Sequence, residues 1–170
     1  MEPVIVNSYT QTKALTRDFF KYTFFYSPFM RICDVLIVIG FAVCMKQLIF
    51  EHTTVSTMWL FPAILIAQVA AFYKTSSLTY EKTVAANGGR EIVITVEVGE
   101  EGVHVLNEKG PVADFGWSQL LAAAFSKNLC LLTIGGGRSV VLSRDGFTKG
   151  SAAELASLAK EKGVKIRGKI

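Results

Sequence analysis

The chain has 170 residues and a net charge of +4, and it is 51% hydrophobic and 19% charged. This length allows one domain with its own core plus an additional apolar segment. The modest charge, with no basic stripe interleaved with aromatic residues, excludes nucleic acid as an expected partner. Three cysteines without metal-binding spacing predict neither a disulfide framework nor a metal site, and no cofactor is expected.

Residues 1–30 are predicted to form a short strand and then an amphipathic helix at a membrane interface. Residues 3–6 are the strand candidate, and Thr16 has the sequence context of an N-cap, with Asp18 in the first helical turn. The helix is rich in aromatic residues and is expected to end or kink at Pro28.

Two apolar stretches, residues 32–50 and 53–73, flank a polar break at Glu51 and His52. Aromatic residues lie near both ends of the stretches, as in the interfacial belt of membrane proteins. We therefore predict a two-helix transmembrane hairpin over residues 31–74. The alternative is a buried hairpin in a soluble protein, but a domain of this size has little with which to cover two helices that are apolar all round.

The distribution of basic residues predicts the orientation of this hairpin. Lysines and arginines flank its outer ends, whereas the tip has none beyond Lys46. The positive-inside rule then places both termini of a two-pass protein in the cytoplasm.

Small residues recur at helical spacing in both apolar stretches. We interpret them as packing between the two helices of one chain, with dimerisation as the alternative. These residues are Gly40, Cys44, Ala63, Ala67 and Ala71.

Residues 75–170 are predicted to form a cytosolic β domain. After the glycine-rich turn at residues 87–89, the apolar pattern changes from a helical period to alternation. Ser151 and Glu154 match a capping box that begins a final helix. The predicted fold class is therefore α+β, with a small antiparallel β-sheet or barrel closed by a C-terminal helix. The expected strands are residues 92–98, 103–106, 112–117, 129–134 and 139–142, whereas 120–125 is ambiguous between helix and strand.

The basic end of the chain is the candidate contact with membrane lipids. Its cations would be attracted to the anionic surface of the cytoplasmic leaflet. The alternative is a solvated helix end whose lysines favour the helix dipole. The cations are Lys160, Lys162, Lys165, Arg167 and Lys169.

No residue pattern predicts catalysis. The glycine-rich loop at residues 135–137 has no Walker lysine and joins two strands, so it is interpreted as a hairpin turn. The two histidines, His52 and His104, are expected on opposite sides of the membrane. Trp117 ends a strand and is interpreted as a packing anchor. The chain is therefore predicted not to be an enzyme.

Four segments carry a resemblance to a known family. They are residues 15–19 (LTRDF), the Glu-Glu-Gly turn within 98–103, residues 115–120 (FGWSQL) and residues 140–147 (VVLSRDGF). With the two close apolar stretches, the chain resembles bacterial YcxB-like membrane proteins. The resemblance implies a cytosolic domain similar to pleckstrin-homology domains and supplies no catalytic residue. Such proteins often have a proline before the basic pair in the last segment, where this chain has Leu142 and Ser143.

The expected function is that of a non-enzymatic inner-membrane protein. Its pleckstrin-homology-like domain would bind a protein partner or lipid headgroups at the cytoplasmic surface. The alternative is an immunity-type membrane protein that neutralises a toxin or complex through its hairpin, in which case Glu51 and His52 would matter most. The sequence leaves the oligomeric state open.

Overall fold

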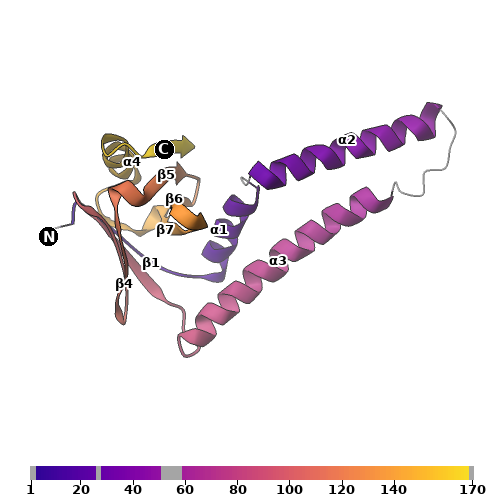
Figure 1. Ribbon diagram of the computed structural model, residues 1–170. Helices are drawn as coiled ribbons and strands as arrows, with labels where there is room; N and C mark the ends of the chain where they lie inside the picture. The colour runs from indigo at the N-terminus through magenta and orange to yellow at the C-terminus, as the bar shows by residue number, and fades with distance from the viewer. Residues whose placement is uncertain (1–2, 26–27, 51–58, 169–170) are drawn as a thin grey trace.

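The structure is a computed structural model that describes residues 3–25, 28–50 and 59–168. Over these residues the chain is α+β, with four α-helices and two β-sheets. Figure 1 shows a β domain from which two long helices project.

The first sheet has the strand order β4-β3-β2-β1-β8, and all its pairs are antiparallel. Its strands are β1 (Ile5–Thr10), β2 (Val93–Val98), β3 (Gly102–Asn107), β4 (Gly110–Gly116) and β8 (Phe147–Lys149). β1 and β2 pair from Ile5↔Val98 to Thr10↔Val93, although three helices separate them in the sequence. The helical segment is thus an insertion between two neighbouring strands of one sheet.

The second sheet has the strand order β7-β6-β5-β9. Its strands are β5 (Leu120–Phe125), β6 (Leu129–Ile134), β7 (Ser139–Ser143) and β9 (Lys165–Gly168). β9 pairs with β5 in parallel, whereas the other pairs are antiparallel. The segment 120–125, ambiguous in the sequence, is therefore a strand.

The apolar core lies between the two sheets and under helix α4 (Ala152–Glu161). The predicted capping residue is confirmed, because the backbone N–H of Glu154 donates to Oγ of Ser151 at 3.2 Å. Trp117 is 9% exposed, and its indole N–H donates to the carbonyl of Gly99 at 3.0 Å, so it is the packing anchor expected.

The inserted helices are α1 (Lys13–Phe25), α2 (Pro28–Phe50) and α3 (Leu60–Ala86). α1 packs against α3, where the rings of Phe24 and Phe72 lie 5.9 Å apart. α2 and α3 approach at Gly40, where an added Cβ would lie 2.6 Å from the ring of Phe61. Towards the β domain the two helices draw apart, and α1 lies between them (Figure 1).

The prediction of a two-helix transmembrane hairpin is wrong. Among the described residues, only Met30–Phe50 is long and apolar enough, by length and composition, to cross a membrane. The apolar part of α3 within the described chain is residues 60–73, which extends roughly 21 Å at about 1.5 Å per residue. This is shorter than the hydrocarbon core of about 30 Å, and polar residues follow from Lys74 onwards.

The orientation drawn from that hairpin loses its support, because it required two spans. The predicted tip at Glu51 and His52 lies outside the described residues, as do residues 53–58, which begin the predicted second stretch.

The prediction of one antiparallel sheet or barrel closed by a C-terminal helix is also wrong. The described strands form two sheets that do not close, and the last strand, β9, follows α4 and pairs in parallel. Thr16 is not the N-cap of α1. The helix begins at Lys13, and the hydroxyl of Thr12 accepts the N–H of Leu15 at 3.2 Å, so Thr16 lies inside the helix.

Candidate functional site

A cleft of about 740 Å³ lies where α2 leaves the β domain. We call it the basic cleft. Its walls come from α1, the first turns of α2, the turn between β5 and β6, and β9. The lining residues are Tyr22, Arg31, Ile32, Phe125, Ser126, Lys127, Lys165, Arg167 and Gly168.

The pairing of β9 places two cations on one side of the second sheet. Ala122 is opposite Lys165 and Ala124 is opposite Arg167. Side chains alternate along a strand, so Lys165 and Arg167 share a face, whereas Ile166 between them packs against the core. Both cations are exposed at the cleft.

Gly168 ends β9 in close contact with β5. Its φ is +85°, a conformation that side chains rarely adopt, and a Cβ there would overlap the carbonyl oxygen of Phe125. Glycine is therefore required at this position for β9 to lie against β5.

Lys127 projects from the tight turn between β5 and β6. The N–H of Ser126 donates to the carbonyl of Leu129 at 2.8 Å, and the N–H of Leu129 donates to Oγ of Ser126 at 3.1 Å. The side-chain amide of Asn128 donates to Oδ2 of Asp18 at 2.7 Å and so connects this turn to α1. The third cation is thus carried by a well-fixed backbone.

Lys127, Lys165 and Arg167 carry uncompensated charge. Across the described chain, none of the three has a carboxylate within the 4.0 Å of an ion pair. With Arg31, the cleft brings together four cationic side chains from three different segments. Clustered charges of one sign raise the local potential and attract anions.

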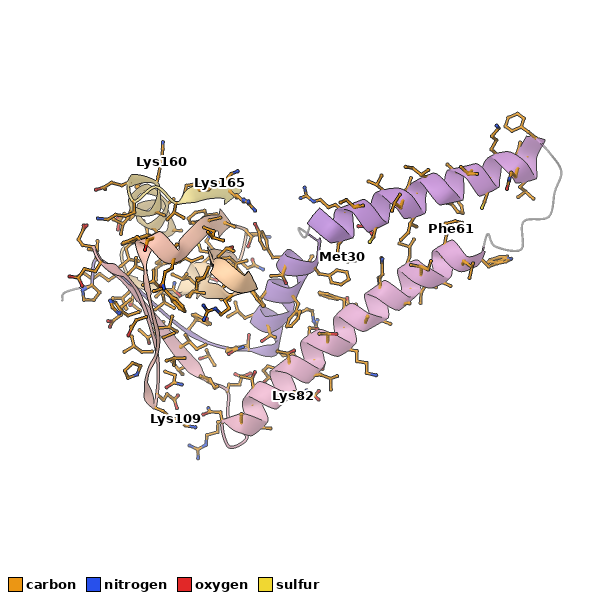
Figure 2. The ribbon with its side chains drawn as sticks, viewed as in Figure 1. Met30, Phe61, Lys82, Lys109, Lys160 and Lys165 are labelled. Carbon is orange, nitrogen blue, oxygen red and sulfur yellow. The ribbon has the colours of Figure 1, made fainter. Side chains whose placement is uncertain are left out.

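The basic cleft opens at the start of an exposed apolar helix. Ile32, in its wall, is 60% exposed, and only 6% of the most apolar window of Met30–Phe50 is buried. Figure 2 shows Met30, at the start of this helix, on the side of the β domain where Lys165 lies.

The five cations predicted to contact lipid have different surroundings in the structure. Lys165 and Arg167 line the basic cleft, whereas Lys160 lies on α4 and is not part of the lining. Lys162 donates to Oε2 of Glu100 at 2.5 Å, and this hydrogen bond raises the pKa of the Lys162 ammonium. Lys169 lies outside the described residues.

Sequence reasoning missed Lys127 as a member of this group. A single lysine in a turn between two strands gives no signal of its own, and only the parallel pairing of β5 with β9 brings it near Lys165 and Arg167. The sequence places Arg31 in the charge that flanks the first apolar stretch, and not with the cations at the end of the chain.

The small residues predicted to pack between helices have different surroundings. Gly40 lies against the ring of Phe61, and Cys44 is 8% exposed. The three alanines of α3 are exposed on its surface; they are Ala63, Ala67 and Ala71.

Other titratable groups lie away from the basic cleft. Nδ1 of His104 is 2.6 Å from Oδ1 of Asp114, and both side chains are exposed. Burial raises the pKa of the Cys130 thiol to about 11, and Arg144 partly opposes this shift. Among the described residues, no group of three or more His, Cys, Asp or Glu side chains is placed to hold a metal ion.

No protein-family model matches this chain, and no curated protein sequence matches it. The resemblance to YcxB-like proteins therefore stays a prediction.

Proposed function

We propose that this is a non-enzymatic protein of the bacterial cytoplasmic membrane that binds anionic lipid headgroups through the basic cleft. The observation that carries the proposal is the position of the cleft. Its cations from β9 and from the β5–β6 turn lie beside Arg31 and Ile32, at the start of the exposed apolar helix α2.

The exposed surface of α2 supports attachment to a membrane. At about 1.5 Å per residue, Met30–Phe50 extends roughly 32 Å, which matches a hydrocarbon core of about 30 Å. Soluble monomers rarely expose continuous apolar surface of this kind. The apolar part of α3 is also exposed, including Ile66 at 70% and Val69 at 51%.

The location of the cleft then matches the headgroup layer. If α2 enters the hydrocarbon shortly after Arg31, the walls of the cleft lie at the depth of the lipid phosphates. Arg167 has the planar donor fork that binds phosphate in two places, and Lys127 and Lys165 act as point charges. Each cation near an anionic surface contributes about 1 kcal/mol to binding.

The test compares the effects of two lipids on the thermal stability of the full chain, which is purified in neutral detergent. The melting temperature is measured in parallel titrations with phosphatidylglycerol or phosphatidylcholine for three proteins. They are the wild type, a cleft variant (Lys127→Gln, Lys165→Gln and Arg167→Gln) and a control variant (Lys82→Gln, Lys109→Gln and Lys160→Gln). The control removes the same charge from exposed lysines elsewhere, and Figure 2 labels all three.

We expect phosphatidylglycerol to raise the melting temperature of the wild type and of the control variant, and to have little effect on the cleft variant. The stabilisation should shrink as salt is raised, because exposed charges are screened beyond about 10 Å at 0.1 M. Equal responses of the two variants would contradict the proposal, and so would equal stabilisation of the wild type by phosphatidylcholine. Either result would leave a protein partner as the occupant of the cleft.

A further inference from the structure

A second cleft lies between the two sheets on the side covered by α1, and we call it the inter-sheet cleft. Its volume is about 510 Å³, within the range of about 300–1,000 Å³ that is usual for small-molecule sites. Leu15 and Phe19 of α1 form one wall, Ile94 and Val105 of the first sheet form another, and Val141 of β7 completes it. Its walls are therefore mainly apolar.

One cation lies in this apolar lining. Arg138, between β6 and β7, is exposed, and its guanidinium carbon lies 5.9 Å from the centre of the Phe115 ring on β4. The side chain thus extends from the second sheet towards the first. Within the described part of the chain, Arg138 has no carboxylate within ion-pair distance.

The polar groups of the inter-sheet cleft include a hydrogen-bond donor that does not ionise. Tyr9 lines the cleft, and burial raises the pKa of its hydroxyl, so that it stays protonated at physiological pH. The lining contains no acidic residue. An occupant would therefore meet mainly apolar walls, one positive charge and a few neutral hydroxyl and amide groups.

We propose that the inter-sheet cleft binds a long-chain fatty acid, with its carboxylate on Arg138 and its alkyl chain between α1 and the two sheets. The charges are complementary, because one unpaired guanidinium matches one carboxylate and can bind it through two parallel hydrogen bonds. The apolar walls match an unbranched hydrocarbon chain. This site is separate from the basic cleft and does not depend on the function proposed for it.

The experiment uses the full chain in nanodiscs of zwitterionic lipid and a palmitate analogue with a photoreactive diazirine in its chain. Crosslinked peptides are identified by mass spectrometry, with unlabelled palmitate or hexadecanol as competitor. We expect saturable labelling of α1 and β7 that palmitate suppresses and hexadecanol does not. Labelling confined to α2 and α3 would show simple partition into the apolar helices and would overturn the proposal.

Two variants test the contribution of the Arg138 charge and that of the cavity separately. Arg138→Gln should weaken labelling about tenfold or more, as expected for loss of a charge-assisted hydrogen bond. Ala113→Trp should also abolish it by filling the cleft. Arg90→Gln, an exposed arginine outside the cleft, is the matched control and should label like the wild type. Because Arg138 is exposed, its replacement leaves the fold intact, and unchanged labelling of Arg138→Gln would overturn the proposal.

Discussion

Gly168 packs against the carbonyl oxygen of Phe125 so closely that no side chain fits between them. This contact fixes the end of β9 on β5, and β9 carries Lys165 and Arg167 into the basic cleft. The arrangement of the candidate lipid site therefore depends on one backbone contact at the end of the second sheet.

Replacing Gly168 with alanine should detach β9. The new Cβ overlaps Phe125, and φ at +85° is unfavourable for alanine, so we expect a loss of about 1–3 kcal/mol in the stability of this strand. Faster amide hydrogen exchange in β9 and β5 would report it. Gly163→Ala is the matched control: its φ is +79°, but nothing lies within 4 Å of the added carbon, so its effect should be smaller. Equal exchange in the two variants would refute the contact.

Asn7 joins the two sheets from a fully buried position. Its side-chain amide donates to the carbonyl of Ser143 at 2.7 Å and accepts the N–H of Ser143 at 3.1 Å. Asn7→Ala leaves both backbone groups without partners, which should cost about 2–4 kcal/mol. Urea unfolding of the β domain, followed by hydrogen exchange, measures this. Asn107→Ala removes a hydrogen bond from an exposed turn and should cost under about 1 kcal/mol. Similar midpoints for the two variants would argue against the buried link.

Trp117→Ala should strongly destabilise the β domain. The side chain is 9% exposed and its indole donates to Gly99, so truncation costs about 3–5 kcal/mol. The same urea titration provides the measurement. Trp59→Ala is the control because Trp59 is 80% exposed, and its β domain should unfold like the wild type. A melting curve unchanged by Trp117→Ala would mean that this residue does not anchor the core.

The stability of the β domain should fall at alkaline pH because of Cys130. Burial raises the thiol pKa to about 11 in the folded chain, whereas a free thiol ionises near about 8.5. Between these values the unfolded chain binds fewer protons, so stability is complete below about pH 8.5 and is lost as pH rises towards about 11. The expected loss is about 2–3 kcal/mol. Cys130→Val should show a shallower decline between pH 8 and pH 10.5, and parallel curves would contradict this.

Local sequence patterns predicted most of the β domain. The apolar run at residues 129–134, followed by the glycine turn, gives β6 with the predicted bounds, and the Ser151–Glu154 capping box marks the start of α4. Both patterns involve only a few neighbouring residues, so the structures that they predict do not depend on distant parts of the chain.

Long-range pairing accounts for what the sequence could not predict. β9 is only four residues long and has one apolar side chain, Ile166, between two cations, so residues 165–168 looked like a solvated basic tail. Its parallel pairing with β5, and the pairing of β1 with β2 across the helical insertion, leave no local signal. The basic cleft depends on the β5–β9 pairing, and so only Lys165 and Arg167 of its cations had been assigned to lipid.

The hairpin prediction is wrong because the second apolar stretch and the helix that contains most of it have different bounds. The second stretch was counted over residues 53–73, whereas the described helix α3 begins at Leu60 and continues as a polar helix to Ala86. Its apolar part is therefore only about half of the helix.

The contact between the Arg167 guanidinium and lipid phosphate tests the central claim most directly. The full chain, with ¹⁵N-labelled arginine, is reconstituted in phosphatidylglycerol bilayers, and ¹⁵N–³¹P dipolar dephasing is measured by solid-state NMR on wild type and on Arg167→Gln. The account predicts strong dephasing of one guanidinium signal that disappears in Arg167→Gln and persists in the control Arg90→Gln. Dephasing that is the same in Arg167→Gln and in the wild type would show that Arg167 does not bind lipid phosphate, and would contradict the proposed role of the basic cleft.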